Sequence, residues 1–215
     1  MQPPPLTCLA VSAALALGLC ASAQAQASDD VVRIGVMADQ TGPYSANGGP
    51  GSSLAVRMAV EDFGGKVLGK PIEVLVADDQ NKPDVGLNIA RKWLDVDKVD
   101  TIVGGSSSSI ALGVSSLMRE RSKPYLVAGT VTADLTNKAC TPMNVQFLTD
   151  TYALPKAGVQ ALMKQGIKSF YFITVDYAFG QAFQEDATRF IQAGGGKVVG
   201  SVKHPLGTTD FSSYL

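Results

Sequence analysis

Histidine is nearly absent from this sequence, in which His204 is the only one among 215 residues. A serine, histidine and aspartate triad needs a histidine beside an activated serine, and the serine cluster at residues 106–109 lacks the G-x-S-x-G spacing. Metal sites use clustered histidine, cysteine or acidic side chains, and the sequence groups none of these. We therefore expect no metal and no other cofactor, and we expect His204 to be an exposed loop residue.

Cysteine is also scarce, with three in the chain. Cys8 and Cys20 fall in an apolar N-terminal stretch, which leaves Cys140 alone in the body of the protein. A single cysteine cannot form an internal disulfide, so we expect Cys140 to carry a free thiol in this chain unless a later cysteine of a complete protein pairs with it.

Charge is sparse and balanced, since 17% of the residues are charged and the net charge is -1. No basic excess is available for phosphate backbones, so nucleic acid is not an expected partner. The glycines at residues 48–51 lack the spacing and the lysine of nucleotide-binding loops. An exported α/β enzyme is therefore the least favoured class of function.

The N-terminus has the pattern of an export signal. An uncharged apolar run over residues 6–23 precedes small residues with A-x-A spacing, and the run is short for a membrane span. We predict a signal peptide over residues 1–25, cleaved after Ala25, and a periplasmic mature protein. The segment before the run lacks lysine and arginine, and the bulky Leu19 before Cys20 disfavours a lipoprotein signal.

From Val31 onward, short β-branched runs alternate with amphipathic segments of helical spacing. This alternation predicts an α/β fold, a parallel sheet with right-handed crossovers and helices on both faces. The predicted strands are 31–37, 71–77, 101–103, 125–128, 145–148, 169–175 and 197–202. The predicted helices are 51–63, 83–94, 110–121, 152–165 and 179–193, with the start of another at 210–215.

The segment 104–109 is the most informative of the loops that follow these strands. It joins a buried strand to a helix through Gly104-Gly105 and four serines. Free backbone N–H groups and the helix dipole at such a junction suit a carboxylate or phosphate. The serines could instead simply cap the helix. In parallel sheets ligands bind beyond the carboxyl ends of the strands, which favours the first interpretation.

Several short motifs together resemble one family from about Val31 to the last residue. The series is Ile34-Gly35-Val36, Thr41-Gly42-Pro43-Tyr44, Asp78-Asp79-Gln80 with Pro83, Val103-Gly104-Gly105-Ser106-Ser107-Ser108, and Gly129-Thr130. Its order and spacing resemble the branched-chain amino-acid-type (Leu/Ile/Val-binding) solute-binding proteins. These are periplasmic receptors of ABC importers with the type I periplasmic-binding-protein fold. The resemblance implies two α/β lobes that close on a ligand and are then presented to a membrane permease.

The resemblance also implies a set of ligand-binding residues. Relatives bind the ligand's carboxylate with the glycine-serine loop, which corresponds here to Ser107 and Ser108. The turn after the next strand corresponds to Gly129, Thr130 and Val131; only the backbone role carries over to Val131, because relatives often have threonine there. The second lobe places an aromatic residue on the ligand and the loop after the first strand adds one more position, which correspond to Phe179 or Tyr177 and to Asn47.

The resemblance divides the chain into lobe I at residues 29–149 and a partial lobe II at residues 150–215. Family members run well beyond this length, and the acidic residue that meets the ligand's amine lies in that part. We therefore expect the chain as given to be C-terminally truncated, monomeric, and to bind ligand weakly or not at all.

The ligand and the role stay open between alternatives. Branched-chain amino acids are the default ligand, but relatives also bind other amino acids, amides, and aromatic or aliphatic acids. Tyr44, Tyr152, Tyr177 and Phe179 would suit an aromatic acid, although aromatic residues at strand ends are often part of the core. A sensory ligand-binding domain of the same fold is the alternative to a transport receptor.

Overall fold

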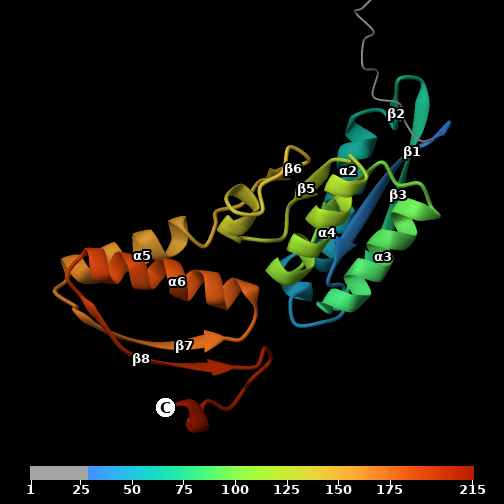
Figure 1. Cartoon of the computed structure of the whole chain (residues 1–215). Coiled ribbons are helices and arrows are strands. Elements are labelled where there is room, and N and C mark those ends of the chain that lie inside the picture. The colour runs from blue at the N-terminus through green and yellow to red at the C-terminus, as the bar shows by residue number, and fades with distance from the viewer. Residues whose placement is uncertain (1–28) are drawn as a thin grey trace, which may run out of the picture.

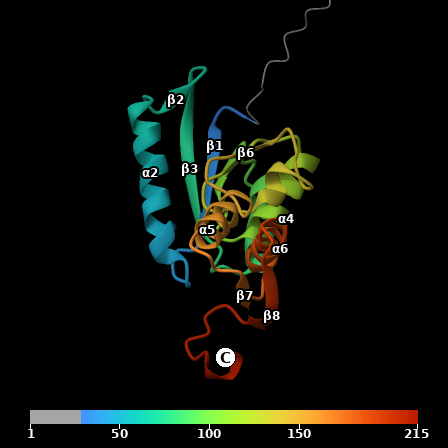
Figure 2. The ribbon, with the colours of Figure 1, turned by 90° about the vertical axis from the view of Figure 1, so that its left-hand side faces the viewer.

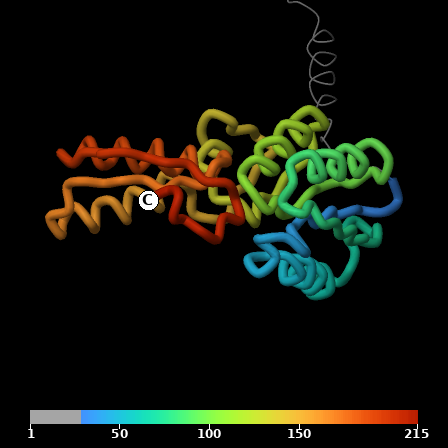
Figure 3. The backbone as a smooth tube through the Cα atoms, turned by 90° about the horizontal axis from the view of Figure 1, so that it is seen from below, coloured from blue at the N-terminus to red at the C-terminus, as the bar shows by residue number. Residues whose placement is uncertain are grey.

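A computed structural model describes residues 29–215 (Figure 1). The predicted signal peptide at residues 1–25 lies outside the described residues. The described chain forms a larger unit (residues 32–146) and a smaller unit (residues 153–204), each with its own sheet. Figure 3 shows the two units side by side, joined by residues 147–152. Among residues 29–215, no helix has the length and apolar character needed to cross a membrane.

The larger unit is built on a six-stranded sheet with the order β2-β3-β1-β4-β5-β6. Five strands pair in parallel as the alternation of strands and helices predicts, and their bounds are β1 Val32–Ala38, β3 Lys70–Asp78, β4 Thr101–Gly104, β5 Tyr125–Val127 and β6 Asn144–Gln146. The edge strand β2 (Lys66–Val67) was not predicted, and it runs antiparallel to β3. Leu68 and Gly69 both have positive φ in the turn between them, as a two-residue hairpin of type I′ requires.

Helices cover both faces of this sheet, as predicted (Figure 2). Helix α2 (Gly49–Asp62) lies on one face, and α3 (Pro83–Asp95) and α4 (Ser108–Glu120) lie on the other. The core lies between the sheet and α3 and α4, where Trp93, Ile102, Ile110, Met118 and Tyr125 are among the buried residues. The burial of these large apolar side chains is the main force that holds the unit together.

The spacing of Leu54, Met58 and Phe63 predicts that these residues form the buried face of α2, but the structure buries a different face. Leu54, Met58 and Phe63 are exposed by 59%, 54% and 66%. The partly buried residues of α2 instead include Val56 and Val60. Periodicity therefore predicted the helix correctly but its buried face wrongly.

The smaller unit pairs β7 (Ser169–Val175) with β8 (Lys197–His204) in parallel. Helices α5 (Ala153–Lys164) and α6 (Ala178–Ala193) lie together over one face of this sheet (Figure 1). Ile191 and Ala187 are the buried centre of its core. In the described part of the chain the opposite face carries no helix, and Tyr171 and Val199 on β7 and β8 are more than half exposed. The predicted helix start at residues 210–215 is a short 3-10 turn, Ser212–Tyr214.

His204 is not the exposed loop residue that we expected. It ends β8, where it pairs with Val175, and it is half-buried. Its ring packs edge-on against Phe211 at 4.9 Å between centroids. The prediction was wrong because strand pairing extends β8 two residues beyond the apolar run that ends at Val202.

Candidate functional site

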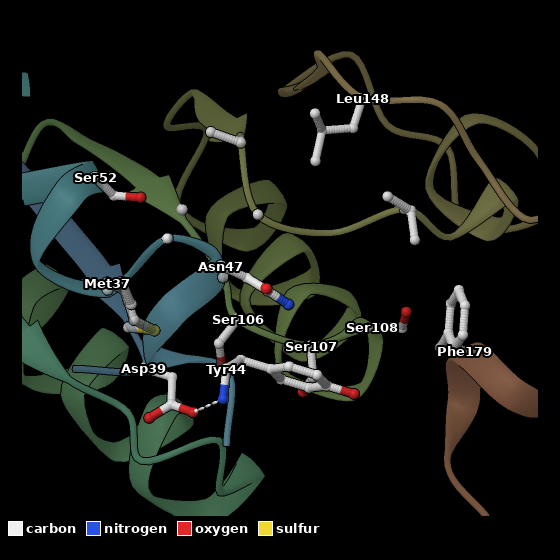
Figure 4. A pocket seen from close by; sticks show the side chains of 18 of the residues that line it. Met37, Asp39, Tyr44, Asn47, Ser52, Ser106, Ser107, Ser108, Leu148 and Phe179 are labelled. Carbon is white, nitrogen blue, oxygen red and sulfur yellow. Dashed lines mark hydrogen bonds between the residues drawn. The ribbon is translucent and has the colours of Figure 1, made fainter. Parts of the chain in front are cut away.

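A cavity of about 400 Å³ lies at the carboxyl edge of the larger sheet (Figure 4). The loops that follow β1, β4 and β5 line it, and the start of α6 contributes from the smaller unit. Parallel strands bring these loops together because all their carboxyl ends lie at one edge. The lining residues are Met37, Ala38, Asp39, Tyr44, Asn47, Gly48, Gly49, Ser52, Gly104, Gly105, Ser106, Ser107, Ser108, Ala128, Gly129, Val131, Leu148, Tyr177 and Phe179.

Seven of the eight predicted site residues line this cavity, namely Asn47, Ser107, Ser108, Gly129, Val131, Tyr177 and Phe179. Thr130 is the exception. It is 2% exposed, and its hydroxyl donates a hydrogen bond to the Gly105 carbonyl at 2.8 Å. Its side chain therefore holds the neighbouring loop in place through the Gly105 carbonyl.

The loop after β4 owes its shape to two glycines. Gly104 and Gly105 have φ of 114° and 95°, and a Cβ on Gly104 would lie 2.1 Å from the Met37 carbonyl oxygen. The hydroxyl of the buried Tyr125 donates a hydrogen bond to the Gly104 carbonyl at 3.0 Å. The Gly104 carbonyl is therefore satisfied from inside the protein, and α4 begins at the cavity lining, where its first N–H groups have no partner within the helix.

The serines of this loop do not cap α4 through their side chains. Ser107 is the N-cap residue, but its side chain accepts no capping hydrogen bond. The Ser106 hydroxyl donates to Asp79 Oδ1 at 2.6 Å. The simple capping interpretation is therefore wrong, and the hydroxyls of Ser107 and Ser108 are left at the cavity wall.

Three helices begin at the cavity. Their N-cap residues Gly48 (α2), Ser107 (α4) and Tyr177 (α6) all line it, and none makes a side-chain capping bond. No lysine, arginine or histidine is among the lining residues. Unpaired N–H groups and aligned dipoles give a helix N-terminus a partial positive charge. The sequence predicted one such helix N-terminus at the site, that of α4, and the fold brings the N-termini of α2 and α6 to the same cavity.

Asp39 is the one carboxylate in the lining, and it is committed to the protein. It is 1% exposed, and it accepts hydrogen bonds from the backbone N–H groups of Gly42 at 2.5 Å and Tyr44 at 2.8 Å. This carboxylate therefore shapes the loop after β1, and both of its oxygens are engaged. This role was not predictable from the sequence, because an aspartate after a strand is common in turns.

The structure also brings Asp39 next to the adjacent pair Asp78 and Asp79. Asp39, Asp78 and Asp79 lie with ligand atoms within 4.8 Å of one another, because β1 and β3 end side by side. Sequence analysis expected no such cluster. Five of the six carboxylate oxygens accept hydrogen bonds within the described structure, and Asp79 Oδ2 is buried without a partner. The main role of these three carboxylates is therefore to accept hydrogen bonds that hold the neighbouring loops at the ends of β1 and β3.

The two adjacent aspartates have opposite pKa shifts. Burial raises the pKa of Asp79, against the lowering effect of hydrogen bonds from Ser106 and Asn81. Burial also acts to raise the pKa of Asp78, but hydrogen bonds from the Thr41 hydroxyl and from backbone N–H groups outweigh it and lower that pKa. The surroundings of Asp78 therefore favour its charged form, and those of Asp79 disfavour it.

The far wall of the cavity is aromatic and comes from the start of α6. The Tyr177 and Phe179 rings stack at 5.9 Å and 28°, and Phe179 continues to Phe183 at 5.8 Å. Figure 4 shows Phe179 facing Ser108 across the cavity. The Tyr177 hydroxyl lies 2.6 Å from that of Tyr44 in the larger unit. Burial, and then the bond to Tyr44, raise the pKa of Tyr177, so its hydroxyl stays protonated.

A family model described as periplasmic binding protein matches residues 31–215. The chain belongs to the periplasmic binding protein family. This periplasmic binding protein is 25% identical over 208 residues to Leu/Ile/Val-binding protein homolog 6 of Brucella abortus, a match that covers 96% of this chain and 52% of that one. It thus spans about half the length of this curated relative.

Solved structures agree with the type I periplasmic-binding-protein fold. A periplasmic binding protein from Burkholderia mallei superposes with a TM-score of 0.83 at 46% identity, over 86% of this chain and 49% of that one. A solute-binding protein of an ABC transporter from Rhodopseudomonas palustris BisB5, in complex with 3,4-dihydroxybenzoic acid, superposes with a TM-score of 0.74 at 27% identity, over 86% and 50%. The predicted family and α/β fold class are confirmed.

The thiol of Cys140 is free among the described residues and exposed, as expected for a lone cysteine.

Proposed function

We propose that this chain is the ligand-binding part of an extracytoplasmic substrate-binding protein of an ABC importer. In this proposal it binds a small carboxylate between lobe I (residues 29–149) and a partial lobe II (residues 150–215). The carrying observation is the convergence of three helix N-termini on one cavity whose lining has no basic side chain. Neutral donors of this kind stabilise an anion without an ion pair.

The magnitude of this effect is sufficient for weak to moderate binding. One helix N-terminus stabilises an anion by about 0.3–2 kcal/mol, depending on burial. A hydrogen bond from Ser107 or Ser108 to a charged oxygen adds about 1.5–3 kcal/mol. A millimolar Kd corresponds to about 4 kcal/mol and a micromolar one to about 8 kcal/mol. The carboxylate end of the site therefore supplies much of the affinity, and Phe179 and its neighbours supply apolar contact.

The ligand we favour is a branched-chain or other amino acid, as the Brucella relative's name suggests. An aromatic acid is the second candidate, supported by the aromatic wall of Tyr44, Tyr177 and Phe179 and by the dihydroxybenzoate-bound relative. In the described lining, Asp39 has both oxygens occupied, so an α-ammonium group finds no free carboxylate there.

In this proposal the protein is exported to the periplasm, works as a monomer without a cofactor or catalysis, and delivers its ligand to a membrane permease. A sensory domain of the same fold is the alternative role. Deletion of the gene separates the two roles: loss of ligand uptake supports the transport role, whereas normal uptake with loss of a ligand-dependent response supports the sensor.

The ligand class is tested by calorimetric titration of the full-length protein from its natural reading frame, purified free of ligand. Leucine, benzoate and 3,4-dihydroxybenzoate serve as probes. We expect at least one to bind, and we expect Ser107→Ala to weaken it about tenfold through the loss of ~1.4 kcal/mol. Ser109→Ala is the matched control, because Ser109 is the one serine of the cluster outside the cavity lining. Equal affinities of the two variants would contradict the proposed carboxylate site.

A further inference from the structure

Two tyrosine hydroxyls form a bridge between the two units of the protein. Tyr44 follows β1 in the larger unit, and Tyr177 is the N-cap residue of α6 in the smaller unit. Their hydroxyl oxygens are 2.6 Å apart although the residues are 133 positions apart in the chain. Both residues line the cavity, so the bridge borders the space available to a ligand.

Both rings of this bridge are anchored. The Tyr44 backbone N–H donates to the buried Asp39 carboxylate at 2.8 Å, a bond drawn in Figure 4. The Tyr177 ring stacks on Phe179. Figure 4 shows the Tyr44 side chain extending from its loop into the space that Ser107, Ser108 and Phe179 surround. The hydroxyl pair is therefore held at the cavity by main-chain and aromatic contacts.

The protons of the pair do not all have partners. A tyrosine hydroxyl carries one proton, so two hydroxyls carry two. One proton lies between the two oxygens, and the hydroxyl that accepts it keeps its own proton. Within residues 29–215, the only hydrogen bond that either hydroxyl makes is the one to the other, so one O–H donor stays available. This remaining O–H donor is open to a water molecule or a ligand oxygen that can accept its hydrogen bond.

We propose that the Tyr44–Tyr177 pair determines ligand specificity by donating its remaining hydroxyl proton to a charged oxygen of the bound carboxylate. The inference builds on the proposed function, and it assigns Tyr44 a role that sequence analysis did not give it. A ligand oxygen bonded to the pair is connected to both units at once. Such a donor selects a carboxylate over its neutral amide, because hydrogen bonds to charged acceptors are about twice as strong.

The pair predicts an unequal and non-additive loss of affinity. Removal of the hydroxyl that faces the ligand breaks the bond to it, which weakens binding about tenfold. Removal of the supporting hydroxyl leaves that bond but takes away its partner, and we expect a loss of about two- to threefold. Because the two groups act in one chain of bonds, the double variant loses about as much as the worse single variant.

The test is a titration of the full-length protein and its Tyr44→Phe, Tyr177→Phe and double variants with benzoate, leucine and their neutral amides. Tyr152→Phe is the matched control, because Tyr152 lies outside the cavity lining and packs its ring on Phe190. Melting temperatures show that each variant is folded. We expect the losses to be larger for the carboxylates than for the amides, and Tyr152→Phe to bind like the wild type.

Three results overturn the inference in different ways. If the wild type binds a carboxylate and both single variants bind it within twofold, the pair makes no bond to the ligand. If the losses multiply in the double variant, or are equal for acids and amides, the hydroxyls do not act as a pair on a charged oxygen. If the wild type binds neither acid and none of a wider set of carboxylates, the proposed function fails, and the inference fails with it.

Discussion

Replacing Asp79 by asparagine should stabilise the protein at neutral pH. The Asp79 side chain is 0% exposed, and its Oδ2 has no hydrogen-bond partner among the described residues. Burial raises its pKa, and the nearby Asp39 carboxylate adds to that effect. Asparagine keeps an Oδ1 acceptor for the Ser106 hydroxyl and replaces the unpartnered oxygen with an N–H donor beside two carboxylates.

The pH dependence follows from the sign of that shift. A raised pKa means that the folded protein binds the proton more tightly than the unfolded chain does, so the cost of charging Asp79 is absent below the unfolded value of about 3.8. The cost grows as the pH rises and is complete above the folded pKa. Each unit of raised pKa corresponds to about 1.4 kcal/mol. The advantage of Asp79→Asn should therefore increase between about pH 4 and neutrality.

We expect a gain in the free energy of unfolding on the order of 1–3 kcal/mol at pH 7, which for a chain of this size is a rise in melting temperature of roughly 2–12 °C. Asp78→Asn is the matched control, since the pKa of Asp78 is lowered and its carboxylate accepts three hydrogen bonds. The free energy of unfolding of that variant should be about 1 kcal/mol lower than that of the wild type at pH 7. Thermal unfolding from pH 3 to 8 measures both. A destabilised Asp79→Asn variant, or a gain that is constant over this range, would refute the reasoning.

Two further predictions concern the loop after β4. Gly104→Ala should lose about 2 kcal/mol or more, because its φ is 114° and the added Cβ would lie 2.1 Å from a β1 carbonyl oxygen, whereas Gly51→Ala has open space and should change stability by less than about 0.5 kcal/mol. Urea unfolding compares the two, and equal losses would contradict the strain argument. Tyr125→Phe should lose about 1 kcal/mol with its buried bond to the Gly104 carbonyl. In the same assay, the exposed Tyr171→Phe serves as control, and a loss as large as that of Tyr125→Phe would contradict the buried bond.

Strand and helix positions were largely predictable because each element has a local pattern. Residues 169–175 form β7 with the predicted bounds, and the helix starting at Pro83 follows from proline at a first helical position and apolar spacing. The strand β2 was missed because Lys66–Val67 is too short to show a pattern, and only its pairing with β3 makes it a strand. The length of β8 was underestimated for the same reason.

The candidate site was predictable where a single loop carries it. The glycine-serine segment was predictable as a candidate ligand-binding loop from its own residues, since two glycines and a run of serines lie between a strand and a helix. The contact of Tyr44 with Tyr177 and the role of Asp39 depend on how other elements meet that loop, and no local pattern shows this. Thr130 shows the opposite case. Its position in the sequence predicts a ligand contact, but its hydroxyl donates a hydrogen bond to the Gly105 carbonyl.

The sequence by itself determined the alternation of strands and helices, the scarcity of histidine, the balance of charge, and the glycine-serine loop, because these depend on composition and on neighbours a few residues apart. Only the tertiary structure decided that three helix N-termini share one cavity, that Asp39, Asp78 and Asp79 meet, and that the hydroxyls of Tyr44 and Tyr177 lie 2.6 Å apart. The physical reason is that parallel strands collect their carboxyl ends at one edge of the sheet. Residues far apart in the chain become neighbours there, and their charges and hydrogen bonds then act together.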